Sequence, residues 1–285
     1  MRYLFRLILL TLALVPTIVH SDRNPKPLVM AHRGGMGLWP ENTIYGFQKA
    51  VESGVDVLEI DIWLTKDNVV VVNHDETVDR TTNGYGKISS FLLEELQQLD
   101  AGYRWSVDGT FPYRGEGHTI STLDHVLEQF PEAHFNIDIK ENSEELIDAL
   151  CAHIDKHNSR DRVLIASFHQ SALQTFRERC PDVRTSAGTW EIIRFIILHK
   201  FHLTGLYNPP FAAFQTPESA GPISIVNPKF IAAAHQRGID VHPWTINEKS
   251  DMCRLIEWGV DGIFTDYPDR LRKVIAEAKG TEGQK

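Results

Sequence analysis

Two kinds of hydrophobic pattern alternate along this chain. Short runs such as 57–64 and 135–139 place polar and apolar side chains at alternating positions, which is typical of strands. Other stretches repeat apolar residues every three or four positions, as Phe230, Ala233 and Ala234 do, which is typical of amphipathic helices. The predicted strands are 28–31, 57–64, 135–139, 163–167, 240–245 and 262–266. The clearest helices between them are 144–156 and 170–179.

A three-residue unit marks where predicted helices end and strands begin. It occurs as Gly54-Val55-Asp56, Gly238-Ile239-Asp240 and Gly259-Val260-Asp261. Glycine can take the left-handed conformation that ends a helix, and a strand follows directly. Repeated alternation of strand and helix predicts parallel strands, either in a closed (β/α)8 TIM barrel or in a doubly wound open sheet. We favour the α/β barrel, because the glycine cluster at 34–37 lacks the residues and spacing of a nucleotide-binding turn.

The length of the chain also suits a barrel. Its 285 residues are close to the roughly 250 of one such domain, so we expect a single barrel over 27–279. Residues from about 75 to 122 break the alternation and are rich in Gly, Asp, Tyr and Arg. A connection of this length is uncommon without structure of its own. We therefore expect a small inserted subdomain near the barrel mouth, where its loops would cap a substrate.

Composition and charge narrow the class of partner. Hydrophobic residues make up 42% of the chain and charged residues 24%, which is ordinary for a globular protein with a large core. Acidic residues outnumber basic ones by 38 to 29, and no run of Lys and Arg is longer than a pair. A nucleic-acid partner is therefore not expected, because such partners require a basic surface.

The first 21 residues read as a targeting segment. Arg2 and Arg6 precede an apolar stretch at 7–19, which predicts a secretory signal, cleavage before Asp22 and export to the periplasm or the medium. A membrane anchor is the alternative, although the stretch is shorter than the roughly 20 residues that span a bilayer. The three cysteines allow at most one disulfide, between Cys151 and Cys180, and buried unpaired thiols are the alternative.

Acidic side chains follow two of the predicted strands. Glu59 and Asp61 are two positions apart and therefore point to the same face, between apolar neighbours. Carboxylates in such a setting repel each other unless a proton or a metal ion intervenes, and hard oxygen ligands suit Mg²⁺ or Ca²⁺. Asp138 supplies a third carboxylate on another strand. By itself it could simply pair with Lys140, but beside the other two it completes an oxygen-rich site where barrel active sites lie.

Two of the thirteen histidines directly follow apolar strands on the same side. His32 comes after Met30-Ala31, and His74 comes after a valine-rich run and Asn73. A histidine at a strand end is often structural, but a pair of them beside a cation suggests acid–base chemistry. Arg33 would offer a bidentate fork to a phosphate group, and Lys140 could hold a phosphate oxygen.

These motifs occur in an order that resembles the glycerophosphodiester phosphodiesterase family, over nearly all of the chain after the targeting segment. The matching segments are 31–35 (AHRGG), 40–43 (PENT), 59–61 (EID), 74–75 (HD), 138–140 (DIK), 244–247 (WTIN) and 262–268 (GIFTDYP). The resemblance implies a barrel with a lid-like insertion and one divalent cation, Mg²⁺ or Ca²⁺. It also implies hydrolysis of glycerophosphodiesters to glycerol 3-phosphate and an alcohol.

The resemblance also implies the role of each site residue. Metal ligands would be Glu59, Asp61 and Asp138, and the acid–base pair would be His32 and His74. Phosphate would bind Arg33 and Lys140, and Trp244 would line the pocket. The third carboxylate is usually Glu in this family and is Asp138 here. In related enzymes the substrate's own neighbouring hydroxyl is thought to attack the phosphorus atom, giving a cyclic phosphate that water then opens.

The sequence does not decide between two classes of substrate. The stretch 190–201 is almost apolar all round, and further apolar residues extend it to 214. It could contact a membrane and admit lysophospholipids, as in family members with lysophospholipase D activity, or it could be an ordinary outer helix of the barrel. A barrel that only binds phosphodiesters or lipid headgroups, and a metal-free enzyme like the bacterial phosphatidylinositol phospholipases, are the remaining alternatives.

Overall fold

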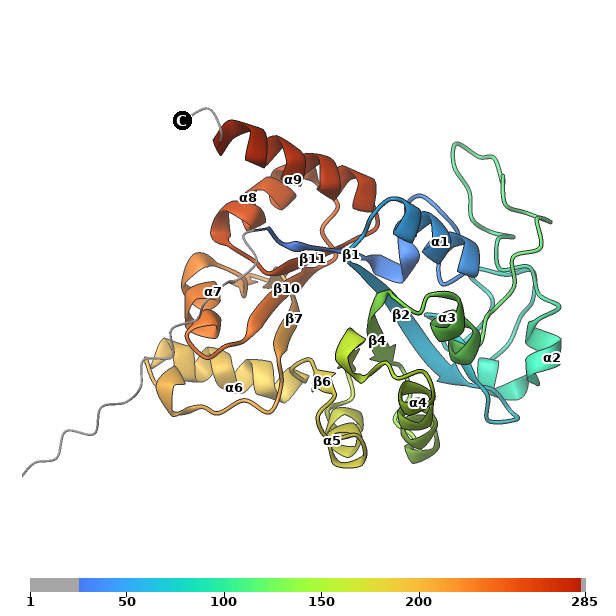
Figure 1. The fold of residues 1–285 in the computed structure, drawn as a ribbon, viewed down its shortest axis with the longest axis horizontal. Coiled ribbons are helices and arrows are strands. Elements are labelled where there is room, and N and C mark those ends of the chain that lie inside the picture. The colour runs from blue at the N-terminus through green and yellow to red at the C-terminus, as the bar shows by residue number, and fades with distance from the viewer. Residues whose placement is uncertain (1–25, 283–285) are drawn as a thin grey trace, which may run out of the picture.

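Parallel strands form the centre of the molecule, and helices surround them (Figure 1). The computed structural model describes residues 26–282. The strands of the barrel are β1 (Leu28–Ala31), β2 (Val57–Leu64), β4 (His134–Ile139), β5 (Val163–Ala166), β6 (Arg184–Thr185), β7 (Ala213–Pro217), β10 (Asp240–Trp244) and β11 (Gly262–Thr265). The helices around them are α1 (Ile44–Glu52), α3 (Leu123–Gln129), α4 (Glu144–Lys156), α5 (Gln170–Arg179), α6 (Thr189–Lys200), α7 (Pro228–His235), α8 (Lys249–Trp258) and α9 (Pro268–Glu282).

Backbone hydrogen bonds close these strands into a ring. One sheet has the order β11-β1-β2-β4-β5-β6, and β7 pairs in parallel with β10. A parallel bridge between Ser186 and Ala213 joins β6 to β7. On the other side, the amide of Asp261 donates to the carbonyl of Val241 at 3.0 Å, which joins β10 to β11. The predicted (β/α)8 barrel is therefore confirmed.

Along each barrel strand, side chains point alternately outward into the apolar core and inward into the barrel interior. Leu58, Ile60 and Ile62 of β2 are buried in the apolar cluster that packs under the helices. Because successive side chains of a strand point to opposite faces, Glu59 and Asp61 lie inside the ring. A second apolar cluster, which includes Phe214, packs the other half of the barrel under α6 to α9. The polar interior is thus supported by an apolar layer on all sides.

The segment after β2 forms the expected insertion. Strand β3 (Val70–Val72) pairs antiparallel with β2, and the one-turn helix α2 (Leu93–Leu96) follows. An apolar cluster of its own stabilises this segment, made of Val71, Val78, Ile88, Leu96, Ala101 and Ile120. The indole Nε1 of Trp105 donates to the carbonyl of Met36 at 2.9 Å. Since Met36 belongs to the loop after β1, the insertion lies against the carboxyl end of the barrel, as predicted.

Two strands of the barrel were not predicted from the sequence. Strand β6 has only two residues, and β7 contains Gln215 and Thr216 and ends at Pro217, so neither shows the period of a half-buried strand. Residues 211–214 were expected to extend an apolar stretch that could contact a membrane or belong to an outer helix of the barrel. Phe214 lies on β7, and both Phe211 and Phe214 are buried in the second apolar cluster.

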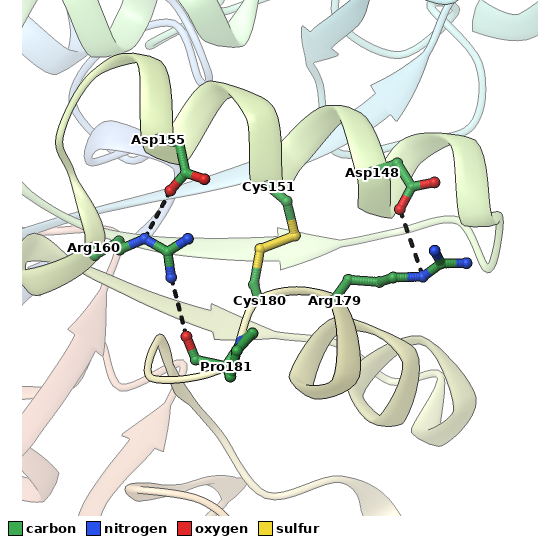
Figure 2. The surroundings of a disulfide bond; sticks show 7 residues. All are labelled: Asp148, Cys151, Asp155, Arg160, Arg179, Cys180 and Pro181. Atoms are coloured by element: carbon green, nitrogen blue, oxygen red, sulfur yellow. Dashed lines mark hydrogen bonds and ion pairs between the residues drawn. A yellow bond between two sulfur atoms is a disulfide. The ribbon is translucent and has the colours of Figure 1, made fainter.

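A disulfide bond links α4 to the end of α5. Cys151 of α4 and Cys180, which directly follows α5, form this bond, and their Cα atoms are 5.9 Å apart (Figure 2). Figure 2 also shows ion pairs beside it, between Arg160 and Asp155 and between Arg179 and Asp148. Cys253 is the free cysteine. Of the two alternatives for the cysteines, the disulfide is the one observed.

The predicted targeting segment, 1–21, lies outside the described residues. Within residues 26–282, no helix has the length and the apolar character that crossing a bilayer requires.

Candidate active site

The three predicted carboxylates lie together at the carboxyl ends of β2 and β4. These strands pair in parallel with Asp61 opposite Asp138 and Glu59 opposite Asn136. All three carboxylates are buried, and Asp61 has no exposed surface. The pairing register therefore places Asp61 and Asp138 in one layer of the barrel interior and Glu59 in the neighbouring layer.

Lys140 is the positive group nearest to these acids. Its Nζ lies 2.6 Å from Oδ2 of Asp138 and 2.8 Å from Oδ1 of Asp61. Burial would raise the pKa of Asp61, but the charges of Lys140 and His74 outweigh burial, and the pKa is lowered. One ammonium group thus holds one of the three acids firmly in its ionised form.

Nearby positive charge does not fully neutralise the other two acids, Glu59 and Asp138. Burial raises the pKa of Glu59 to about 7, and the charge of Asp61 adds to this increase. The pKa of Asp138 is also raised, mainly by burial, and its Oδ1 atom is buried without a hydrogen-bond partner. Buried carboxylates of this kind need a further positive charge. Three carboxylates, of which Asp138 has an oxygen atom without a hydrogen-bond partner, fit a hard divalent cation such as Mg²⁺ or Ca²⁺.

His32 lies beside this cluster and pairs with an acid that directly follows the last barrel strand. Its Nδ1 lies 2.6 Å from Oδ1 of Asp266, and Asn247 donates from Nδ2 to the other carboxylate oxygen at 2.7 Å. Burial would lower the pKa of His32, but the bond to Asp266 and the charge of Glu59 raise it. A carboxylate on Nδ1 fixes the ring orientation and leaves Nε2 for proton transfer.

His74 follows β3 and has a carboxylate partner of its own. Its Nδ1 lies 2.6 Å from Oδ1 of Asp75, and Arg80 donates from Nε to Oδ2 of the same carboxylate at 2.6 Å. The pKa of His74 is lowered, first by burial and despite the charge of Asp61. The two histidines therefore have pKa values shifted in opposite directions, as an acid and a base in one site require.

The loop after β1 brings Arg33 into the same site. Arg33 has a φ of 51°, and in this left-handed conformation its amide donates to Oε2 of Glu59 at 2.7 Å. Its guanidinium donates from Nη1 to Oε1 of Glu41 at 3.1 Å, and Arg80 binds both oxygens of Glu41. Asn42 donates from Nδ2 to Oδ2 of Asp61 at 2.9 Å. Residues of this loop thus fix the positions of both the Arg33 guanidinium and the Asp61 carboxylate.

All eight residues proposed from the sequence line one cavity of about 710 Å³. They are His32, Arg33, Glu59, Asp61, His74, Asp138, Lys140 and Trp244. The supporting residues Asp266, Asn247, Asp75, Glu41 and Asn42 were quoted within motifs or neighbouring segments, but they were given no role. Sequence spacing offers no signal for the pair of His32 and Asp266, which are 234 positions apart, whereas Asp75 directly follows its partner His74.

The cavity is lined by both polar and apolar side chains. Seven of the eight residues above are polar, and helix α6 contributes Ile192, Ile193, Ile196 and Ile197 to the same lining. Trp244 and Phe168 also line the cavity and pack edge to face, with ring centroids 5.8 Å apart. Such a cavity suits an amphiphilic ligand with an anionic group, and its volume lies in the range for small-molecule sites.

The chain is similar to several known proteins over most of its length. A model of the Glycerophosphoryl diester phosphodiesterase family matches residues 32–270. A glycerophosphodiester phosphodiesterase of Caldanaerobacter subterraneus subsp. tengcongensis is 36% identical, over 88% of this chain and 98% of its own. Human lysophospholipase D GDPD1 is 28% identical, over 90% of this chain and 89% of its own. A phosphodiesterase of Oleispira antarctica, solved with the product sn-glycerol-3-phosphate, is 28% identical with a TM-score of 0.71, over 88% of this chain and 97% of its own.

Proposed function

The chain belongs to the glycerophosphoryl diester phosphodiesterase family, and we propose that it hydrolyses glycerophosphodiesters to glycerol 3-phosphate and an alcohol. One observation carries the proposal. Three buried carboxylates, two carboxylate-paired histidines, an arginine and a lysine converge on a single cavity at the carboxyl end of the barrel. Together these groups can supply what phosphodiester cleavage needs: neutralisation of negative charge, activation of a nucleophile and protonation of the leaving alkoxide.

Metal binding is the first part of the proposal. Glu59, Asp61 and Asp138 would hold one Mg²⁺ or Ca²⁺ ion, because their burial leaves them short of positive charge. When bound, such an ion supplies positive charge to the phosphate oxygens and to the oxygen that attacks. Arg33 and Lys140 would contribute further positive charge at the same place.

Proton transfer is the second part. We assign His74, with its lowered pKa, to remove a proton from the substrate's neighbouring hydroxyl as its oxygen bonds to phosphorus. His32, with its raised pKa, would donate a proton to the leaving alcohol as its bond to phosphorus breaks. Water would then open the cyclic phosphate, and the two histidines would exchange roles.

Chelation tests the metal requirement. Dialysis against EDTA should abolish hydrolysis of glycerophosphocholine, and Mg²⁺ or Ca²⁺ should restore it. Glu59→Gln should lose metal and activity with little change in fold, because the amide keeps the shape of the side chain and removes its charge. Full activity after exhaustive chelation would favour a metal-free mechanism, and no hydrolysis with either ion would favour a barrel that only binds its ligand.

A second candidate substrate is a lysophospholipid. It is favoured by the apolar wall from α6, which continues from the cavity to the surface: Ile193 lines the cavity and is 39% exposed, and Ile197 is 52% exposed. A glycerophosphodiester headgroup has no apolar part for this wall to contact, whereas an acyl chain does. The phosphate would bind among the polar residues of the cavity, and the acyl chain of the lipid would extend along α6.

Substitutions in the wall separate the two substrates. Ile193→Ser and Ile197→Ser should each lower kcat/KM for lysophosphatidylcholine by about tenfold, since each removes apolar surface worth more than 1 kcal/mol. Hydrolysis of glycerophosphocholine should not change. Equal effects on both substrates, or no effect on either, would exclude an acyl site at α6.

Contact with a membrane surface is a separate proposal. Trp190, Phe201 and Leu206 are 69%, 64% and 82% exposed and do not line the cavity. Exposed aromatic and aliphatic residues in one segment are typical of interfacial binding. Combined replacement of the three by Ala should weaken binding to phosphatidylcholine vesicles and leave turnover of soluble glycerophosphocholine unchanged. Unchanged vesicle binding would show that this segment makes no such contact.

Export is the last part of the proposal. The segment 1–21 has the pattern of a cleaved signal, and the disulfide between Cys151 and Cys180 suits an oxidising compartment. The mature amino terminus should begin near Asp22 in the extracytoplasmic fraction. An intact amino terminus in the membrane fraction would support the anchored form instead.

A further inference from the structure

A second group of potential metal ligands lies on the outside of the barrel, where α3 and α4 meet. Asp124 is on α3, His153 is on the last turn of α4, and His157 directly follows that helix. One ligand atom from each residue lies within 4.8 Å of the others. None of the three residues lines the active-site cavity, so this group serves no step of the proposed hydrolysis.

The helix itself brings the two histidines together. Residues four positions apart on a helix occupy the same face, which places His153 and His157 side by side towards α3. They also lie at the carboxyl end of α4, where unpaired carbonyl groups give the helix a partial negative charge. A cation bound at this end is favoured by the helix as well as by Asp124.

Three nitrogen atoms converge on one oxygen of Asp124. Its Oδ1 lies 2.6 Å from Nζ of Lys156, 2.8 Å from Nε2 of His157 and 3.3 Å from Nδ1 of His153. The hydrogen bonds from Lys156 and His157 hold the pKa of Asp124 well below its usual range, so the carboxylate is ionised. Burial lowers the pKa of His153, which favours the neutral imidazole that binds metals.

Two of the three distances between the ligand atoms are close to those of a tetrahedral zinc site. Bonds of about 2.0–2.1 Å from zinc to nitrogen or oxygen place neighbouring ligand atoms roughly 3.3 Å apart. The two imidazole nitrogens are 2.8 and 3.3 Å from the carboxylate oxygen. Lys156 is the competing cation, but its side chain is 62% exposed and can turn into solvent. An exposed ion pair of this kind contributes little stability, so its loss opposes metal binding weakly.

We propose that Asp124, His153 and His157 bind one Zn²⁺ ion, with water as the fourth ligand. Two imidazoles and one carboxylate are the ligands of a borderline metal, in contrast to the all-oxygen set in the active site. The ion would tie α3, which directly follows the inserted segment, to α4 of the barrel. Its binding does not depend on the proposed hydrolysis.

Zinc stoichiometry tests the site directly. The full chain, stripped with chelator and supplied with excess Mg²⁺ to occupy the carboxylates of the active site, is titrated with Zn²⁺ by calorimetry. Wild type should bind one equivalent, and His153→Ala/His157→Ala should lose it. Glu59→Gln is the matched control, and it should retain the equivalent although it loses hydrolysis. Equal zinc binding by wild type and the double variant would overturn the proposal.

Two further measurements keep the outcome clear if the double variant folds poorly. Zinc at a hundredfold excess over its Kd should raise the Tm of wild type by roughly 5–10 °C, as expected for a ligand of the folded state alone. Lys156→Met removes the competing cation, so it should tighten zinc binding severalfold. Because this variant keeps all three ligands, the absence of measurable zinc binding by Lys156→Met would show that the cluster is only a hydrogen-bonded surface contact.

Discussion

Replacing Asp266 by Asn tests how the structure prepares His32 for proton transfer. The change removes the negative charge that faces Nδ1 of His32 at 2.6 Å and keeps the size of the side chain. Asn247 holds the other oxygen of this carboxylate, so the loop geometry should persist. Turnover should therefore fall although the fold is kept, because the imidazolium form loses its partner.

The size of the effect follows from the surroundings of the pair. The side chains of His32 and Asp266 are 17% and 18% exposed, so solvent screens their interaction only in part. A hydrogen bond between charged groups contributes about 1.5–3 kcal/mol, which corresponds to a fall in kcat of roughly 10-fold to 150-fold. KM should change little, since Asp266 does not line the cavity.

The pH profile of the variant reveals which role His32 has. The bond to Asp266 raises the pKa of His32, so Asp266→Asn should lower that pKa. If His32 acts as the acid, the alkaline limb of kcat/KM should move to lower pH, because the protonated form is lost earlier. If His32 acts as the base, the acidic limb should move instead.

Asp75→Asn provides the matched control. The bond to Asp75 also raises the pKa of its histidine, His74, so this variant should move the opposite limb. Both profiles should be recorded with glycerophosphocholine at saturating metal. Unchanged turnover and unchanged limbs in Asp266→Asn would refute a functional pairing of His32 with Asp266.

Three further predictions concern the histidines, the disulfide and the core. His32→Ala and His74→Ala should each lower turnover at least about a hundredfold and keep metal binding, measured by calorimetry; a substrate with a good leaving group should rescue only the variant without the acid. Cys151→Ala opens a cross-link between residues 29 positions apart and should lower the free energy of unfolding by about 3–4 kcal/mol in a denaturant titration, whereas Cys253→Ala should have a much smaller effect. Burial lowers the pKa of His242, so as pH falls below about 6.5 the unfolded chain takes up a proton that the folded chain does not, and stability is lost. His242→Leu should reduce this loss of stability on acidification, and an identical acid dependence of the variant would contradict the prediction.

Several features of this protein could be read from local sequence patterns. The period of two in β2 and β4 placed Glu59, Asp61 and Asp138 on one face, and the strand register then brought them together as expected. This works because side-chain direction in a strand depends only on neighbouring residues. The alternation of strands and helices likewise predicted the barrel, since parallel strands need helical connections. Strands β6 and β7 escaped prediction because they are short and lack that period.

Other features were decided only by the tertiary structure. The partner of His32 comes from a separate loop, and nothing in the local sequence of His32 specifies Asp266. The apolar residues of α6 could equally have been an outer helix or a membrane contact, because an apolar surface has no directional preference. Packing against β7 buries Phe195 and leaves Ile193 facing the cavity. The sequence by itself therefore determined which chemical groups this protein carries, and the closure of the barrel decided which of them meet, because contacts between distant segments exist only once the chain has folded.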